Sequence, residues 1–166
     1  MGEARTHHHA GAITFRPIRP EDADFLYEVY ASTRQDMLAA LGWTAAQGDA
    51  FLRMQFHAQD QSYRTQFPNA DFLIVLLQER PIGRLYVERR ADEILGIDIP
   101  LLPAYRQAGI GTAILHDLFA EAARVGKPFR FHVEKMNVRA RRLYERLGCT
   151  VLTDDGMFLF MEWVPD

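Results

Sequence analysis

The sequence predicts a mixed α/β fold, in which helices cover both faces of a mostly antiparallel central sheet. Apolar runs of strand length alternate with longer segments whose apolar residues recur at helical spacing. Within 71–101, short turn segments separate three such runs, as in an antiparallel meander. With 166 residues, 48% of them hydrophobic, we expect one domain over 12–166 after a flexible leader at 1–11.

The elements before the meander follow from local signals. Residues 13–19 alternate apolar and polar side chains, which predicts a strand. Pro20 begins a helix, because proline suits a first turn, and 41–43 is a break. Thr44 and Gln47 form a capping-box pattern for the next helix, which is expected to reach about Ser62.

The later elements are predicted in the same way. A helix that begins near Ile110 is expected to end at Gly126, with Pro128 beyond it, and Gly148 is expected to cap a second helix over 137–147. The strands are expected at 71–77, 81–88, 94–101, 129–133, 149–152 and 158–164. The last two form a hairpin around the turn at 154–156.

Composition limits the classes of function. A net charge of −3 gives no global basic footprint for nucleic acid, and no apolar run approaches a membrane span. The N-terminus lacks the apolar core of a signal peptide, so a cytoplasmic location is expected. The single cysteine, Cys149, excludes an intramolecular disulfide and a cysteine-pair metal site. The His7–His9 tract, native or not, is better explained as a disordered start than as a metal ligand.

The segment 98–112 carries the most informative motif. An apolar strand leads through a turn into Arg106-x-x-Gly109-x-Gly111, which begins an amphipathic helix. The first backbone N–H groups of a helix have no partner inside it, and together with the helix dipole they bind phosphate. Glycine removes the side chains that would keep a phosphate away from the backbone. The motif therefore predicts a diphosphate cradle.

A second segment makes the prediction specific. Asn137-x-x-Ala140-x-x-Leu143-Tyr144-Glu145-x-Leu147-Gly148 follows the apolar run 129–133. Together, in this order, the two motifs resemble those of the GCN5-related N-acetyltransferase (GNAT) superfamily, in detail over 94–149. The resemblance implies acetyl-CoA as acyl donor, a splayed strand pair that admits it, and no metal. It also implies direct transfer of an acetyl group, in a ternary complex, to a primary amine of a small molecule or peptide.

The resemblance assigns the cofactor residues. Backbone N–H groups of Gln107 to Thr112 would bind the pyrophosphate, and Arg106 either adds charge or is a solvated loop arginine. The family often has a basic residue or glycine where Gln107 and Ala108 stand, a departure that leaves the backbone cradle intact. The strand end at Ile99, Leu101 and Leu102 would pair with pantetheine. Pro100 has no N–H, so Leu101 or Leu102 must donate to the thioester oxygen. The full cofactor set is Ile99, Leu101, Leu102, Arg106, Gln107, Ala108, Gly109, Ile110, Gly111, Thr112, Asn137, Ala140 and Tyr144.

Asn137 and Tyr144 are seven residues apart and so share a helix face, with the small Ala140 between them. Asn137 is expected to cap this helix, to bind the pantetheine arm or preceding loop, or both. Tyr144 is expected to protonate the leaving thiolate, which a phenol with a pKa near 10 can do.

Three residues are candidates for the base that deprotonates the amine. His132 and Glu134 alternate along one strand and therefore point to one face. Asp98 lies on a neighbouring strand and could act directly or through water. A surface or ion-paired role remains the alternative for each, and a water chain could replace all three.

The acceptor pocket would be built from the first two helices, their connector and the closing hairpin. Its candidate residues are Tyr27, Trp43, Gln55, Phe56, Gln59 and Tyr63. The two glutamines lie in an otherwise apolar helical stripe, so they line a polar pocket or mark the edge of the core. An amino acid, an aminoglycoside, another small amine and a peptide N-terminus all remain open as acceptors.

The main rival function is a non-catalytic acyl-CoA-binding or sensing module, because a fold does not fix a function. Tyr144 favours catalysis, since binding alone needs no proton donor. Cys149 is not expected to carry an acyl group, because no base lies near it in the sequence. The basic surface of 139–146 is best explained as a solvated helix face. The acyl-chain preference, and whether the protein is a monomer or a homodimer, remain open.

Overall fold

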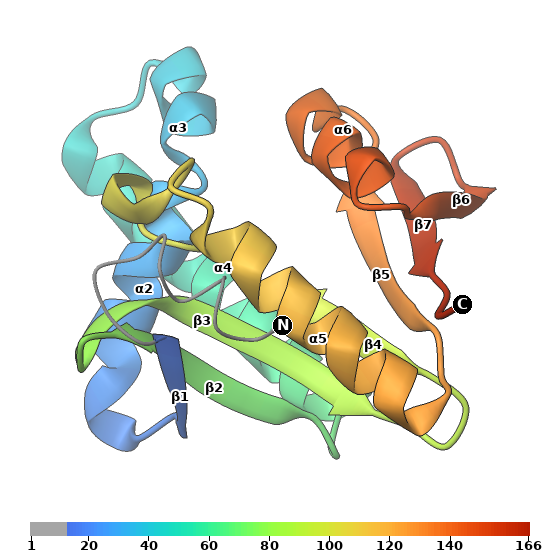
Figure 1. Cartoon of the computed structure of the whole chain (residues 1–166). Helices are drawn as coiled ribbons and strands as arrows, with labels where there is room; N and C mark the ends of the chain where they lie inside the picture. The colour runs from blue at the N-terminus through green and yellow to red at the C-terminus, as the bar shows by residue number, and fades with distance from the viewer. Residues whose placement is uncertain (1–12) are drawn as a thin grey trace. The chain divides into compact units, whose positions relative to one another are not determined.

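The computed structural model describes residues 13–166 (Figure 1). The expected leader at 1–11 and the His7–His9 tract lie outside the described residues. The chain divides into two compact units. The first contains the described residues up to Tyr86 together with 98–110, and the second contains 87–97 together with 111–166.

The predicted fold class is confirmed, because the strands form one seven-stranded sheet in the order β1-β2-β3-β4-β5-β7-β6. The pairs β1–β2, β5–β7 and β6–β7 are antiparallel, and β4–β5 is parallel. The strands are β1 (Ile13–Pro17), β2 (Asp71–Leu77), β3 (Arg80–Arg89), β4 (Ile94–Asp98), β5 (Phe129–Glu134), β6 (Thr150–Asp154) and β7 (Phe158–Trp163). The helices are η1 (Pro20–Asp22), α2 (Ala23–Ser32), α3 (Gln35–Leu41), α4 (Ala45–Gln66), η2 (Pro103–Tyr105), α5 (Ile110–Val125) and α6 (Val138–Arg146).

In the first unit, helices α2 and α4 pack against the sheet through one apolar cluster. Its buried members are Leu26 and Tyr30 of α2, Leu52 and Phe56 of α4, and Ile74 of β2. Phe56 is only 7% exposed. It therefore belongs to this core, and the structure gives it no surface for an acceptor molecule.

The predicted capping box starts α4 as expected. The Thr44 hydroxyl accepts from the Gln47 backbone N–H at 3.2 Å, and the Gln47 side chain accepts from the Thr44 N–H at 3.1 Å. The helix continues one turn beyond Ser62, where Arg64 pairs with Asp60 on its surface. Upstream, the short helix α3 ends at Gly42, which adopts a left-handed φ of 66°.

In the second unit, α5 and α6 contact the same face of β5. The Phe119 ring of α5 lies 5.6 Å from that of Phe129, and the Tyr144 ring of α6 lies 4.5 Å from that of Phe131. Phe129 and Phe131 are two residues apart on the strand, so both side chains project from one face. The β4–β5 ladder comprises three pairs and ends at Gly96–Phe131, whereas β5 continues to Glu134 alongside β7.

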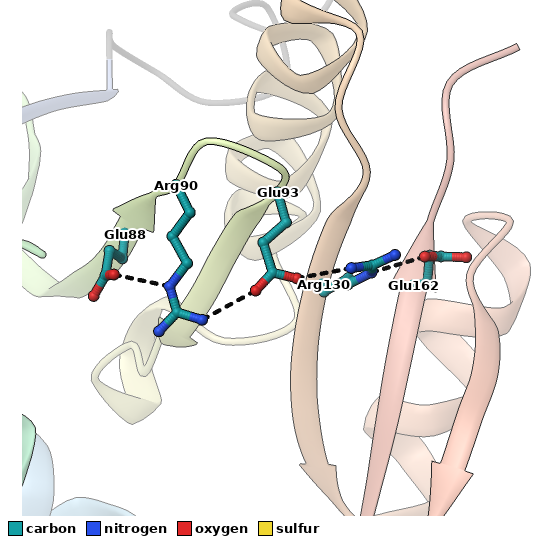
Figure 2. Close-up of polar contacts among 5 residues, drawn as sticks. All are labelled: Glu88, Arg90, Glu93, Arg130 and Glu162. Carbon is teal, nitrogen blue, oxygen red and sulfur yellow. Dashed lines mark hydrogen bonds and ion pairs between the residues drawn. The ribbon is translucent and has the colours of Figure 1, made fainter. Parts of the chain in front are cut away.

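A ladder of five charged residues lies across the second unit (Figure 2). Arg90 pairs with Glu88 and Glu93, and Arg130 pairs with Glu93 and Glu162. Arg130 and Glu162 are direct cross-strand partners on β5 and β7. Arg130 alternates with Phe129 and Phe131, so this ladder lies on the face of β5 opposite to α5 and α6.

Candidate functional site

The strand end after β4 has an unusual backbone arrangement. Leu101 forms an isolated antiparallel bridge with Gly83. The flanking hydrogen bonds run from Arg84 N–H to Pro100 O at 3.1 Å and from Leu102 N–H to Ile82 O at 2.8 Å. Gly83 and Leu101 are therefore a non-hydrogen-bonded pair, and the Leu101 N–H points away from β3.

This geometry distinguishes between Leu101 and Leu102, the two expected donors to the thioester oxygen. The Leu102 N–H is already used by the Ile82 carbonyl, whereas the Leu101 N–H is directed away from the sheet partner. Of the two, Leu101 is therefore the better candidate. The strand expected at 94–101 is therefore too long: β4 ends at Asp98, Ile99 and Pro100 lie outside any strand, and pairing resumes only as the single bridge at Leu101. Proline suits such a break because it has no N–H for the ladder.

Gly83 permits the close approach of these two backbones. A Cβ atom at this position would lie 2.5 Å from the Pro100 carbonyl oxygen and 3.1 Å from Leu101 Cα. Both neighbours are backbone atoms, so no side-chain rotation relieves the clash. No local sequence pattern marks Gly83, because the close contact that requires a glycine comes from Leu101, 18 residues downstream.

Arg106 is engaged within the protein. Its Nε donates to the Leu101 carbonyl at 2.9 Å, and its Nη2 donates to the Ser32 hydroxyl at 3.0 Å. The side chain thus ties the loop to the strand end and to the end of α2. The alternative of a freely solvated loop arginine does not describe this contact, and the expected contribution to phosphate binding stays a prediction.

The glycine loop turns sharply into α5. Gln107 and Gly109 have left-handed φ angles of 61° and 81°, and the helix begins at Ile110. Gly109 adopts this conformation without steric cost, whereas Gln107 is a non-glycine residue in the left-handed region. A Cβ atom at Gly111 would meet nothing within 4 Å. The surface around Gly111 is open, as a backbone phosphate cradle requires.

A buried arginine, Arg84 of β3, joins two of the predicted site residues. It is 3% exposed. Its Nε donates to Asp98 Oδ2 at 3.0 Å, and its Nη2 donates to Gln59 Oε1 at 2.9 Å and also bonds Asp98 Oδ2. Asp98, expected as a base, and Gln59, expected in the acceptor pocket, therefore meet at one guanidinium group.

Tyr63 lies beside this cluster. Burial, followed by the charge of Asp98, raises the pKa of the Tyr63 hydroxyl to about 12. Its ring contacts that of Tyr86 at 5.8 Å, and Arg84 lies 4.8 Å from the Tyr86 ring centre. One helical turn before Gln59, Gln55 accepts a long 3.4 Å hydrogen bond from the Tyr30 hydroxyl.

Two other expected acceptor residues have partners elsewhere in the first unit. The Tyr27 hydroxyl donates to Asp49 Oδ1 at 2.6 Å, and Arg53 covers its ring at 4.1 Å. Burial and the hydrogen bond to Asp49 raise the pKa of Tyr27 to about 12. Trp43 is 42% exposed and packs edge-on against Phe51. The structure does not bring Tyr27 or Trp43 into the Arg84 cluster.

The second motif lies in the second unit. The Asn137 side chain accepts from the Ala140 backbone N–H at 3.2 Å, so its expected helix-capping role is confirmed. Tyr144 is half-buried on α6 against Phe131. His132 and Glu134 alternate with Phe131 and therefore lie on the opposite face of β5, where the His132 ring stacks on Phe160 at 4.5 Å.

Cys149 is buried, and this burial raises the pKa of its thiol to about 11. The thiolate is the reactive form of cysteine, so the environment disfavours nucleophilic chemistry here. The expectation that Cys149 carries no acyl group is consistent with this environment.

Comparison with known proteins shows the family. Residues 12–150 match the family model described as Acetyltransferase (GNAT) domain. The match covers most of the chain, and the chain belongs to the GNAT acetyltransferase family. No curated protein sequence matches it significantly.

Solved structures share the fold at low sequence identity. The PaiA N-acetyltransferase from Thermoplasma acidophilum, in complex with coenzyme A, is 21% identical, with a TM-score of 0.68 over 92% of this chain and 99% of that one. An acetyltransferase from Thermus thermophilus is 18% identical, with a TM-score of 0.65 over 94% and 99%. Arabidopsis thaliana NAA60, in complex with a bisubstrate analogue, is 15% identical, with a TM-score of 0.56 over 93% and 99%.

Within 13–166, no three His, Cys, Asp or Glu side chains gather as a metal ion would require. None of the helices in this part of the chain combines the length and apolarity needed to cross a membrane.

Proposed function

We propose that the protein is an N-acetyltransferase that moves an acetyl group from acetyl-CoA to a primary amine of a small molecule or peptide. The observation that carries the proposal is the bridge between Gly83 and Leu101, which leaves the Leu101 N–H directed away from β3 just before the glycine loop. A backbone N–H aimed at developing negative charge on oxygen is worth about 3–4 kcal/mol in favourable sites.

The loop fits a pyrophosphate by its own chemistry. The first N–H groups of α5 have no acceptor inside the helix, and 16 residues of aligned peptide dipoles stand behind them. The open surface at Gly111 lets an anion reach this backbone. Acetyl-CoA, when bound, would supply the acetyl group. The backbone of Gln107 to Thr112 would hold its pyrophosphate.

The remaining roles belong to side chains. Tyr144 would give a proton to the leaving sulfur, because a phenol can donate to a group of pKa about 8.5. Asp98, His132 and Glu134 stay candidates for the group that takes the amine proton. A direct transfer needs no acyl carrier on the protein, in agreement with the burial of Cys149.

Calorimetric titration with acetyl-CoA tests the cradle, and Gly111 is the best position for a variant. In Gly111→Ala the added Cβ meets no protein atom within 4 Å, so the fold should be intact and this variant should lose less affinity than the glutamate variant. Gly111→Glu should lose at least about tenfold in affinity, because a longer acidic side chain would occupy and repel the phosphate site. Its fold should persist, because an acidic residue in the first helical turn is favourable. Equal affinities for all three proteins would contradict the cradle.

A turnover assay distinguishes the proposed enzyme from the rival function, a non-catalytic acyl-CoA sensor. An enzyme should release CoA in the presence of amines, and Tyr144→Phe should slow this release by about 10²-fold or more while acetyl-CoA affinity stays within about twofold. Tight binding of acetyl-CoA without turnover of any amine would instead favour the sensor.

A further inference from the structure

The cluster around Arg84 fixes the orientation of Gln59. Arginine is only a donor, so the atom of the Gln59 amide that faces Arg84 Nη2 must be the oxygen Oε1. The Gln59 NH₂ group therefore points away from Arg84, and it has no hydrogen-bond partner within the described residues. Gln59 is half-buried, so this donor is accessible to a small molecule.

Arg84 bonds only one of the two carboxylate oxygens of Asp98. Nε and Nη2 of Arg84 both bond Oδ2, whereas Oδ1 has no partner among residues 13–166. The Asp98 side chain is 26% exposed. The cluster thus presents a free carboxylate oxygen and a free amide donor. Gln59 Oε1 and Asp98 Oδ2 both accept from the same nitrogen, Nη2 of Arg84, so the amide and the carboxylate are neighbours.

We propose that this pair selects the acceptor. The acceptor is a primary amine that carries an ether, hydroxyl or carbonyl oxygen close to its nitrogen, as in an amino alcohol, an amino sugar or an α-amino amide. Asp98 Oδ1 binds the amine N–H, Gln59 Nε2 donates to the neighbouring oxygen, and Arg84 is the positioning residue that orients both. The inference rests on the proposed N-acetyltransferase function and names its substrate class.

A plain alkyl amine fits this arrangement less well. It satisfies Asp98 but leaves the Gln59 amide donor facing a methylene group, and an unmade hydrogen bond at a partly buried donor costs affinity. Sites built to hydrogen-bond a substrate oxygen reject analogues that lack it, because their own polar groups are then left unpaired.

Matched amines test the proposal. 2-Methoxyethylamine and n-butylamine have similar length and differ by one oxygen in place of one methylene. We expect the wild type to acetylate the methoxy amine with a kcat/KM about tenfold higher, and Gln59→Met to lose most of this preference. Comparing the same two amines across both proteins cancels their difference in basicity. Calorimetry with acetyl-CoA should give the same affinity for both proteins.

Arg84→Lys tests the positioning role. Lysine keeps the charge but lacks the guanidinium fork, so it cannot reproduce the bonds to Asp98 and Gln59 together. The preference for the oxygen-bearing amine should fall as in Gln59→Met, and KM for amines should rise while acetyl-CoA affinity is retained. Asp98→Asn should raise KM for both amines by a similar factor.

The outcomes separate this proposal from the general function. If the wild type acetylates both amines with equal kcat/KM, or if Gln59→Met keeps the wild-type preference, the substrate class is wrong and the N-acetyltransferase function stands. If the wild type binds acetyl-CoA and acetylates no amine in either class, the proposed function fails and the selection mechanism fails with it.

Discussion

Arg106 holds the backbone of Leu101, the residue proposed to donate its N–H to the thioester oxygen. Its Nε bonds the carbonyl of Leu101, the residue whose N–H is the best candidate for the oxyanion donor. Its Nη2 holds the Ser32 hydroxyl, which itself donates to the Val29 carbonyl at 2.7 Å. One side chain therefore fixes the strand end relative to α2.

Replacing this arginine should affect catalysis more than cofactor binding. We expect Arg106→Met to lower kcat by about 3- to 10-fold, the equivalent of one lost hydrogen bond, while the calorimetric Kd for acetyl-CoA changes less than threefold. Arg106→Lys is the matched variant that keeps the charge. A large loss of acetyl-CoA affinity in Arg106→Met that Arg106→Lys restores would show that the charge binds phosphate directly.

The site residues predicted from the sequence differ in a physical way from those that only the structure brings forward. Gly109, Gly111, Asn137 and Tyr144 belong to local motifs, whose spacing a sequence displays. Arg84 meets Gln59 across 25 residues and Asp98 across 14, so no local pattern marks it. A charged residue inside the apolar run of β3 was the one signal available, because buried arginines require partners.

Helix ends were predicted correctly where a short local residue pattern marks them. The capping box of α4 and the glycine that ends α5, Gly126 with a φ of 67°, both appear in the structure. The helix expected to run from Pro20 to the break at 41–43 is divided, because α2 ends at Ser32 and α3 begins at Gln35. Arg34, at the N-cap of α3, makes no side-chain capping bond, so no capping pattern marks this division in the sequence. The break predicted at 41–43 is the end of this helix.

The start of α2 depends on Asp22. Arg16 of β1 donates to both carboxylate oxygens of Asp22 at 2.8 Å, and the Arg19 N–H donates to Oδ2 at 2.7 Å. These bonds, above all those from Arg16, hold the pKa of Asp22 below its ordinary value of 3.8. Asp22 as a whole residue is 6% exposed, and its carboxylate joins the first strand to the first helix.

The Asp22 contacts predict a pH-dependent stability. A carboxylate with a lowered pKa in the folded state stabilises the fold above its unfolded pKa, near 3.9, and loses that contribution as pH falls through the folded value. At pH 7, Asp22→Asn should lower the free energy of unfolding by about 1.5–3 kcal/mol. Urea unfolding should show the difference shrinking below about pH 4. A constant difference from pH 7 to pH 3 would contradict the charge-based account.

The charged ladder of the second unit joins four segments, with Glu93 at its centre (Figure 2). Glu93 is 8% exposed and accepts from Arg90 and Arg130, both at 3.0 Å. Removing its charge would leave two guanidinium groups facing each other across a neutral amide.

This ladder should contribute more to the free energy of unfolding than an exposed ion pair does. Glu93→Gln should lower the free energy of unfolding by about 1–3 kcal/mol, because each arginine loses a charge-assisted bond. The control is Glu145→Gln, which breaks the exposed pair with Arg141 on α6 and should cost less than about 1 kcal/mol. Denaturant titrations of the two variants measure both. Equal losses would show that burial of the ladder adds nothing.

For the molecule as a whole, fold and family are established and the acceptor is the open question. The family model spans residues 12–150, and the similar structures cover 92–94% of the chain. At sequence identities of 15–21%, these similar structures show the fold of the chain but do not identify its acceptor. The choice of acceptor therefore has to come from this chain's own residues, above all the Arg84 cluster.

The most direct test of the account is a mass-spectrometric assay of acetyl transfer. The full-length protein is incubated with acetyl-CoA and a panel of primary amines, and both free CoA and acetylated amine are quantified. The account predicts amine-dependent release of CoA, with one acetylated amine formed for each CoA released. Release of CoA without acetylated amine, or retention of intact acetyl-CoA by a protein that binds it, would contradict the N-acetyltransferase function.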